Sequence, residues 1–151
     1  MGFGNLATTI IMFIAVMLLS TAVIVSFRTQ TDQAQASMRS QSEFLNNQIK
    51  TNIDIVSTNY SASNLRIYVL NNGKTTLKPE TVDVYVNNIF IPRDDANRTI
   101  SIEASTDTRN PGLWDPDEII RIDVDTTLSS GTQAVRVGTT YGISDESTFS
   151  V

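Results

Sequence analysis

The chain has 151 residues and a formal net charge of −5, from 11 Lys and Arg against 16 Asp and Glu. This length leaves room for one domain and an anchoring segment, and the scattered cations form no basic stripe of the kind that nucleic-acid binding requires. Because Cys and His are both absent, disulfides, the usual zinc and haem ligand sets and Ser–His or Cys–His catalytic pairs are excluded. We therefore expect a protein that is not an enzyme and has no metal site and no cofactor.

Residues 1–27 contain no charged side chain and are apolar on every side of a helix. As a helix, the roughly 25 residues from Phe3 to Phe27 would reach about 37 Å, which exceeds the ~30 Å hydrocarbon layer of a membrane. A cleaved secretory signal would begin with basic residues and have a shorter apolar core. A buried core helix of this length would need a larger domain than the remaining residues supply. Residues 1–27 are therefore predicted to be a retained transmembrane anchor.

The orientation of this anchor depends on weak signals that disagree. Arg28 and Arg39 follow the apolar segment, and the positive-inside tendency would keep the C-terminal side in the cytoplasm. Asn59 and Asn97 each begin an Asn-x-Ser/Thr acceptor, which is glycosylated only outside the cell. The character of the C-terminal domain favours an extracytoplasmic location over a cytoplasmic one. We expect the C-terminal domain to be extracytoplasmic, with Asn59 and Asn97 as candidate N-glycosylation sites.

Residues 28–51 contain neither Pro nor Gly and form a polar helical stalk with one thin apolar stripe. The stripe consists of Ala34, Met38, Gln41, Leu45 and Ile49, at spacings of four and three. A stripe of this width is typical of a helix that packs against one neighbour. Two neighbours are compatible with it: another helix, which implies self-association, or the chain's own β-domain.

Residues 52–151 change to a period of two, which is typical of half-buried antiparallel strands. The alternating apolar sets are Ile53/Ile55, Leu65/Ile67/Val69, Val82/Val84/Val86, Ile100/Ile102, Ile120/Ile122/Val124 and Val135/Val137. Turn signals such as Asn71-Asn72-Gly73 and Asn110-Pro111-Gly112 separate them. Seven or eight short strands at this spacing predict an antiparallel β-sandwich. The expected fold class is mainly β with a long N-terminal α-helix.

Three apolar side chains are candidate contacts for a partner protein. Leu113 and Trp114 lie in the loop 110–116, where Trp114 is either an exposed anchor of the kind enriched in binding hot spots or a plug at the end of the sandwich. Phe90 lies in the short run Ile89–Ile91, which is either an open edge for strand addition or a buried hairpin tip.

An acidic cluster follows Trp114, formed by Asp115, Asp117 and Glu118, with Asp123 and Asp125 at strand spacing behind it. Oxygen ligands this close together could hold Ca²⁺, but the D-x-[DN]-x-[DN]-G loop is missing. A general acid–base pair has no pocket to support it in the sequence. We interpret the cluster as a solvated acidic loop and predict no metal-binding or catalytic residue.

Several segments together resemble a known family. They are Met1–Phe3, Asn64–Leu77, Val82–Val86, Leu113–Glu118, and Gly131–Val137 with Tyr141–Ser144. With these segments the chain resembles the archaellin superfamily of archaeal type IV pilin-like proteins, and within it the archaellum accessory proteins F and G. The resemblance implies an immunoglobulin-like sandwich in the pseudoperiplasm and an anchor in the cell membrane. Type F is implied to bind the S-layer and type G to associate with it; the Met1–Phe3 start favours F.

The sequence departs from this family at its start. Filament-forming members are made with a short basic leader, whereas this sequence begins directly with the apolar segment, so either no leader is made or the sequence is the mature form. Asn5 stands where bacterial pilins carry Glu. The resemblance implies a non-enzymatic stator protein that links the motor to the envelope through S-layer protein or a homologous accessory protein. A filament subunit and a generic membrane-anchored binding domain are the alternatives.

Overall fold

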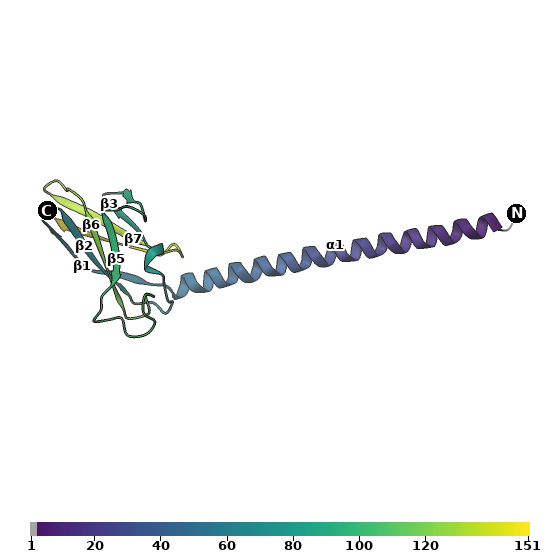
Figure 1. Cartoon of the computed structure of the whole chain (residues 1–151), viewed down its shortest axis with the longest axis horizontal. Helices are drawn as coiled ribbons and strands as arrows, with labels where there is room; N and C mark the ends of the chain where they lie inside the picture. The colour runs from purple at the N-terminus through teal and green to yellow at the C-terminus, as the bar shows by residue number, and fades with distance from the viewer. Residues whose placement is uncertain (1–2) are drawn as a thin grey trace. The chain divides into compact units, whose positions relative to one another are not determined.

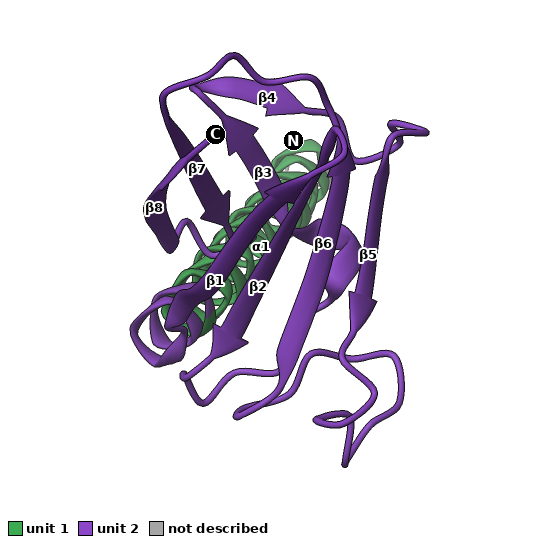
Figure 2. Cartoon of the chain, turned by 90° about the vertical axis from the view of Figure 1, so that its left-hand side faces the viewer, with its two compact units in different colours: residues 1–43 green, residues 44–151 purple. Residues whose placement is uncertain are grey.

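The structure is a computed structural model that describes residues 3–151. Within these residues it contains one long helix, α1 (Phe3–Lys50), one short 3-10 helix, η1 (Pro79–Thr81), and eight strands (Figure 1). The strands are β1 (Ile53–Ser61), β2 (Asn64–Asn71), β3 (Asp83–Val86), β4 (Ile89–Ile91), β5 (Arg98–Ile102), β6 (Ile119–Asp125), β7 (Thr132–Gly138) and β8 (Ser144–Ser150). The chain divides into two compact units, Met1–Glu43 and Phe44–Val151 (Figure 2).

The N-terminal part of α1 is apolar on all sides. An 18-residue window of Gly4–Lys50 has a mean hydropathy of 2.7, and none of that window is buried in the protein. The hydroxyls of Thr8, Thr9, Ser20 and Thr21 each donate to the carbonyl four residues earlier, at 2.8–2.9 Å. These bonds satisfy the hydroxyls inside the helix, so they do not oppose an apolar environment. By length and composition, α1 can cross a membrane.

The strands form two antiparallel sheets of four strands each. The first has the order β1-β2-β6-β5, which Figure 2 shows side by side, and the second has the order β4-β3-β7-β8. The predicted fold class, mainly β with a long N-terminal helix and an antiparallel sandwich, is confirmed.

The core lies between the two sheets and is built from the alternating apolar positions. Its buried side chains are Ile53, Leu65, Ile67, Val69, Leu77, Val82, Val84, Val86, Trp114, Ile120, Ile122, Val124, Val135 and Val137. Direct cross-strand partners such as Val69 with Ile120 and Val84 with Val137 keep the apolar sides of neighbouring strands in register. Because burying each such side chain contributes roughly 1.5–3 kcal/mol, this core stabilises the domain without a disulfide.

Polar side chains connect the sheets along both sides of the sandwich. On one side, the backbone N–H of Ile55, at a bulge in β1, donates to Asp145 Oδ2 of β8 at 2.8 Å. On the other side, Arg98 of β5 donates from Nη1 to the carbonyl of Ile91 at 3.1 Å and from Nη2 to the carbonyl of Val82. These bonds occupy polar groups at the sheet edges that would otherwise have no partner.

Two strands differ from what the alternating pattern alone indicates. β8 has the sequence Ser-Asp-Glu-Ser-Thr-Phe-Ser, and Phe149 is its only large apolar side chain. As an edge strand it pairs with β7 on one side only, and its charged side chains Asp145 and Glu146 discourage pairing with a further strand on the open side. β4 is the opposite edge, and its Ile89 and Phe90 are 68% and 44% exposed. This exposure fits the open edge and not the buried hairpin tip.

The last two turns of α1 belong to the same compact unit as the strands. The Phe44 ring lies 5.7 Å from the Tyr141 ring, and Gln48 Nε2 donates to the Tyr141 carbonyl at 2.9 Å. Leu45 and Ile49, from the predicted stripe, are instead 47% and 84% exposed. The helix therefore packs on its own sandwich with a different side, and the stripe is left open.

A glycine allows the chain after β2 to approach the end of α1 closely. A Cβ on Gly73 would lie 2.5 Å from Asn52 N and 2.7 Å from Lys50 O. The next residue, Lys74, donates its backbone N–H to the Lys50 carbonyl at 2.7 Å. This bond satisfies one of the free carbonyls at the helix C-terminus. Gly73 is therefore required by space at the junction between α1 and the sandwich.

Candidate partner interface

Trp114 is not on the surface, so the expectation that it contacts a partner is corrected. Its side chain is fully buried, and its Nε1 donates to the Glu118 carbonyl at 2.8 Å. Its backbone forms an isolated bridge with Leu77, with bonds of 2.8 and 2.9 Å. A buried indole needs a partner for its N–H, and the turn to Glu118 supplies one. Trp114 therefore plugs the sandwich, while Leu113 beside it is half-buried.

Phe90 is exposed and belongs to a row of side chains across the outer face of the second sheet. Tyr85 of β3 pairs with Phe90 of β4 and with Arg136 of β7, and Arg136 pairs with Glu146 of β8. The Phe90 and Tyr85 rings are 5.3 Å apart, and the Arg136 guanidinium carbon lies 4.4 Å from the Tyr85 centroid. We call Phe90, Tyr85, Arg136 and Glu146 the outer row. It combines an aromatic surface with a cation, a composition enriched in protein interfaces.

A surface ion pair borders the outer row. Arg93 Nε donates to Asp83 Oδ1 at 2.9 Å, and both side chains remain partly exposed. Exposed pairs of this kind contribute only about 0–1 kcal/mol. The aromatic part of the surface therefore offers more binding free energy than its charges do, and Phe90 is the predicted contact residue that the structure leaves available.

The acidic cluster is dispersed among separate hydrogen-bond networks. Asp115 and Glu118 are buried: Glu118 Oε1 accepts from Thr108 N at 3.0 Å and Oε2 from Asp115 N at 2.9 Å. Asp123 accepts from Arg66 and Arg121, at 2.8 and 2.9 Å. Among residues 3–151, no three His, Cys, Asp or Glu side chains are grouped closely enough to hold a metal ion. The carboxylates organise loops and strands instead.

Asp115 holds the loop between β5 and β6. Its Oδ1 accepts from the Thr76 hydroxyl, and its Oδ2 accepts from the backbone N and side-chain Nδ2 of Asn110 at 3.1 and 2.8 Å. The Thr76 hydrogen bond lowers the pKa of the Asp115 carboxyl from its ordinary value; burial opposes this shift, and the Asn110 bonds add to it. Asp115 therefore acts as a structural acceptor in its charged form.

Both glycosylation acceptors lie on exposed parts of the domain. Asn59 is exposed in β1, and Asn97 is exposed in the turn before β5, where its Nδ2 donates to Asp95 Oδ1 at 3.0 Å. Their use as glycosylation sites stays a prediction. On the helix, Ala34 and Met38 are exposed, so the stripe of Ala34, Met38, Leu45 and Ile49 stays a prediction as a packing surface for a neighbour.

Sequence reasoning did not identify Tyr85, Arg136 or Arg98. Tyr85 and Arg136 alternate with buried valines, so the sequence could have placed each on an outer face. Their contact depends on β3 and β7 being neighbours, although they are about 50 residues apart, which no local pattern indicates. In the sequence, Arg98 has the pattern of an ordinary polar strand residue. Its burial is explained only by the placement of β5 opposite β4.

One comparison with a solved structure supports this fold. Among solved structures, the archaellum periplasmic stator protein FlaG from Sulfolobus acidocaldarius is similar, with 18% identity and a TM-score of 0.54, over 66% of this chain and 99% of that chain. The periplasmic stator complex of FlaF and FlaG from the same organism gives 18% identity and a TM-score of 0.49, over 64% and 87%. No curated protein matches the chain.

The family assignment comes from a separate comparison. The family model described as archaeal-type flagellin matches residues 2–149, which is nearly the whole sequence and includes both the apolar helix and the sandwich. This match confirms the resemblance to the archaellin superfamily at the level of the family. The chain belongs to the archaeal-type flagellin family.

Proposed function

We propose that this protein is a non-enzymatic, membrane-anchored component of the archaellum that holds a partner through its β-sandwich. The observation that carries this proposal is the helix α1, which is uncharged up to Phe27, exposed, and continuous into the domain. A helix of this composition is favoured in a lipid or in a bundle of like helices and disfavoured in water. The sandwich then acts outside the membrane as a binding domain.

Within the archaellum we assign the chain to the accessory, or stator, class. The Sulfolobus protein with a similar fold is named as a periplasmic stator protein. The polar residues 28–43 suit a stalk between a membrane and a domain. A filament subunit remains the second candidate, because the matching family is that of archaeal-type flagellins. In a filament, the apolar helices would pack against each other in a central bundle.

The proposed partner is the S-layer protein or a homologous accessory protein. A static element has to resist torque, and scattered surface charges contribute too little free energy for that. The outer row supplies an exposed aromatic ring, Phe90, beside Tyr85 and Arg136. Hot spots of protein interfaces are enriched in Tyr and Arg. We place the attachment surface on this face and the sandwich outside the cell.

The experiment that tests the function is quantitative mass spectrometry of fractionated archaeal cells that express the full chain. A stator should remain in the membrane fraction after high-salt and carbonate washing and be absent from sheared filaments. If this chain is the major component of purified filaments, the filament-subunit role replaces the stator role. Recovery in the soluble fraction, without detergent or filaments, would contradict both.

The orientation has its own test. Protease added to intact cells should remove an epitope tag placed after Val151 if the sandwich is outside, while a cytoplasmic marker stays intact. Protection of the tag until the membrane is opened would place the domain in the cytoplasm and exclude S-layer attachment.

A further inference from the structure

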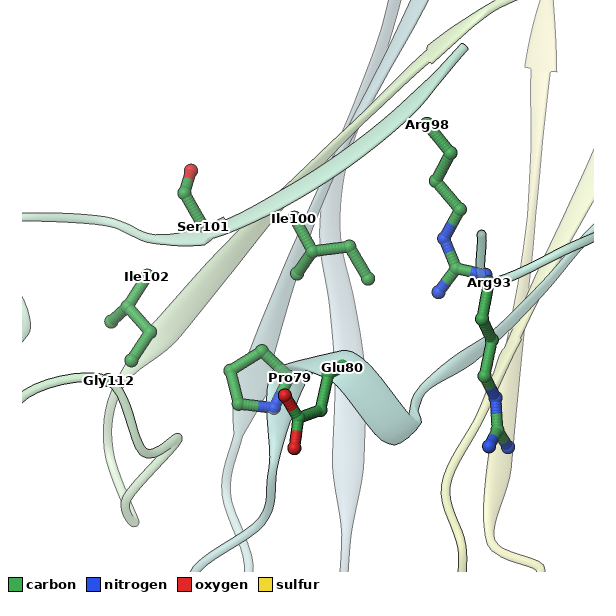
Figure 3. Close-up of a pocket in the computed structure, with 8 residues that line it drawn as sticks. All are labelled: Pro79, Glu80, Arg93, Arg98, Ile100, Ser101, Ile102 and Gly112. Carbon is green, nitrogen blue, oxygen red and sulfur yellow. The ribbon is translucent and has the colours of Figure 1, made fainter. Parts of the chain in front are cut away.

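A cleft lies at the side of the sandwich where β5 faces η1. It has a volume of about 370 Å³, near the lower end of the roughly 300–1,000 Å³ usual for ligand sites. It is lined by Pro79, Glu80, Arg93, Arg98, Ile100, Ser101, Ile102 and Gly112 (Figure 3). The two arginines lie at one end of the cleft, and Ile102 and Gly112 lie at the other.

Arg98 is the unusual member of this lining. Its exposed fraction is only 7%, yet its guanidinium has no carboxylate in salt-bridge contact among residues 3–151. Nη1 and Nη2 donate to the carbonyls of Ile91 and Val82, and Nε is buried with no hydrogen-bond partner. An arginine has five N–H groups, so the described residues leave part of its donor capacity unused.

A buried guanidinium without an ion-pair partner is unfavourable, because burial removes its hydration and no carboxylate lies within ion-pair distance to compensate for it. Burial accordingly lowers the pKa of Arg98 from its ordinary value; Asp83 opposes this shift, and Arg93 adds to it. Arg93 cannot relieve the positive charge, and its own Nε is already paired with Asp83 Oδ1. The arginine end of the cleft therefore favours an anion.

The rest of the cleft favours an apolar stem and a single negative charge. Pro79 and Ile100 supply apolar surface near the middle of the cleft, and Ile102 continues it at the end opposite the arginines. Glu80, on η1, is the one carboxylate in the lining, and it would repel a phosphate or a dicarboxylate more than a monoanion.

From these features we infer that the cleft binds a monocarboxylate on a short apolar stem, such as a glutamate side chain or a small free carboxylic acid. The carboxylate accepts hydrogen bonds from the N–H groups of Arg98 Nη1 and Nη2 that the bonds to Ile91 and Val82 leave free. The stem lies on Pro79, Ile100 and Ile102. Arg98 thus has two roles: it connects the sheet edges through Ile91 and Val82, and it supplies the counter-charge to the ligand. This site does not depend on the archaellum role.

The test uses the full chain in detergent micelles, labelled with ¹⁵N so that the arginine Nε–H signals are resolved by NMR. Sodium valerate is titrated at constant ionic strength, and 1-pentanol and pentylammonium chloride are matched probes without the carboxylate. We expect a saturable shift of the Arg98 Nε–H signal with valerate only. No saturable shift, or an equal shift with pentanol, would overturn the inference.

Two variants separate the cleft from general surface effects. Glu80→Gln removes the repulsive charge and should tighten valerate binding about twofold to fivefold. Arg66→Gln removes a partly exposed arginine of β2 that is not in the cleft lining, and should leave the dissociation constant unchanged. Arg98→Lys, which keeps a charge but not the planar fork, identifies the Arg98 signal. If Arg98→Lys fails to fold, the titrations of the wild-type protein and of Glu80→Gln still test the inference. An unchanged affinity of Glu80→Gln for valerate would contradict binding in this cleft.

The same titration distinguishes the two sources of the carboxylate. The peptides acetyl-Ala-Glu-Ala-amide and acetyl-Ala-Gln-Ala-amide differ only in the charge of the central side chain. Binding of the Glu peptide at least tenfold tighter than valerate, with loss in the Gln peptide, identifies a protein segment as the ligand. Valerate that binds as tightly as the Glu peptide identifies a small free acid. Equal binding of the two peptides would contradict the inferred chemistry.

Discussion

Gln48, in the last turn of α1, donates from its Nε2 to the backbone carbonyl of Tyr141 in the loop between β7 and β8, at 2.9 Å. Phe44, one turn earlier, places its ring against the ring of the same residue. The helix end is thus held by a loop 93 residues away in sequence. Residues Phe44–Lys50 are therefore part of the folded domain and not a separate stalk.

The junction between helix and sandwich should be sensitive to Gly73→Ala. The added Cβ would lie 2.5 Å from Asn52 N and 2.7 Å from Lys50 O, both backbone atoms that cannot rotate away. We expect a loss of about 1–3 kcal/mol in the free energy of unfolding, measured by thermal unfolding of the full chain in detergent. Gly138→Ala is the control, because its Cβ meets nothing closer than 3.9 Å. Equal effects of the two variants would contradict this account.

Trp114→Ala should destabilise the domain by about 3–5 kcal/mol, because it removes the largest fully buried side chain of the core. Trp114→Phe should cost less but should still lose the bond from Nε1 to the Glu118 carbonyl. Chemical denaturation followed by near-ultraviolet circular dichroism measures both. A Trp114→Ala variant as stable as the parent protein would return this residue to the surface.

The stability of the domain should fall at acid pH through Asp115. The folded pKa of this carboxyl is lowered below its ordinary value of 3.8, so the unfolded chain takes up a proton first as the pH falls. The stabilisation is complete above the unfolded pKa and is lost as the pH falls through the folded pKa. At pH 7 the Asp115→Asn variant should have a lower melting temperature than the parent protein. Below pH ~3.8 the melting temperatures of the two proteins should approach each other. A constant difference at all pH values would mean that the charge of Asp115 does not contribute to the stability.

Phe90→Ala should leave the fold intact, because this side chain is 44% exposed on an edge strand. We expect it to weaken binding to purified S-layer sheets by about 2 kcal/mol, measured by sedimentation of the full chain in detergent with the sheets. Asp94→Lys, an exposed charge reversal, is the control and should matter less. Asp145 is unsuitable as a control because its carboxylate accepts from Ile55 N. A larger effect from Asp94→Lys would mean that the interface is electrostatic and lies elsewhere.

Ile14→Arg should impair membrane retention. A charged residue at the centre of a membrane-spanning helix costs about 2.5–3.5 kcal/mol for insertion, and Ile14 lies in the middle of the uncharged segment. Carbonate extraction should release a larger fraction of this variant than of the parent protein. Gln41→Arg places the same side chain in the polar part of α1 and should extract like the parent. Identical extraction of both variants would mean that the apolar segment does not hold the chain in the membrane.

The sequence predicts the secondary structure well where periodicity is strong. The alternating valines and isoleucines of β2, β3, β6 and β7 all face the core, because burial on one side of a sheet requires a period of two. The prediction was weakest at the edges: β8 carries almost no apolar signal, and the exposure of β4 depends on its place in the sheet.

The candidate site was harder to predict, because exposure is not encoded locally. Trp114 and Phe90 both lie in short apolar segments next to turns, yet one is in the core and the other is on the surface. What separates them is long-range: Trp114 is fixed by a bridge to Leu77, and Phe90 stacks on Tyr85 at the sheet edge. The burial of Arg98 depends in the same way on a long-range contact, because the edges of the two sheets meet around its side chain.

The strand order has a consequence for when the domain can form. In the first sheet β2 pairs with β6, so that Asn64 lies opposite Asp125. In the second sheet β3 pairs with β7, which follows it in the sequence by about 50 residues. Neither sheet can be completed from the first half of the chain, and pairings between distant segments form slowly. The sandwich therefore cannot be completed until the strands β6, β7 and β8 have been synthesised.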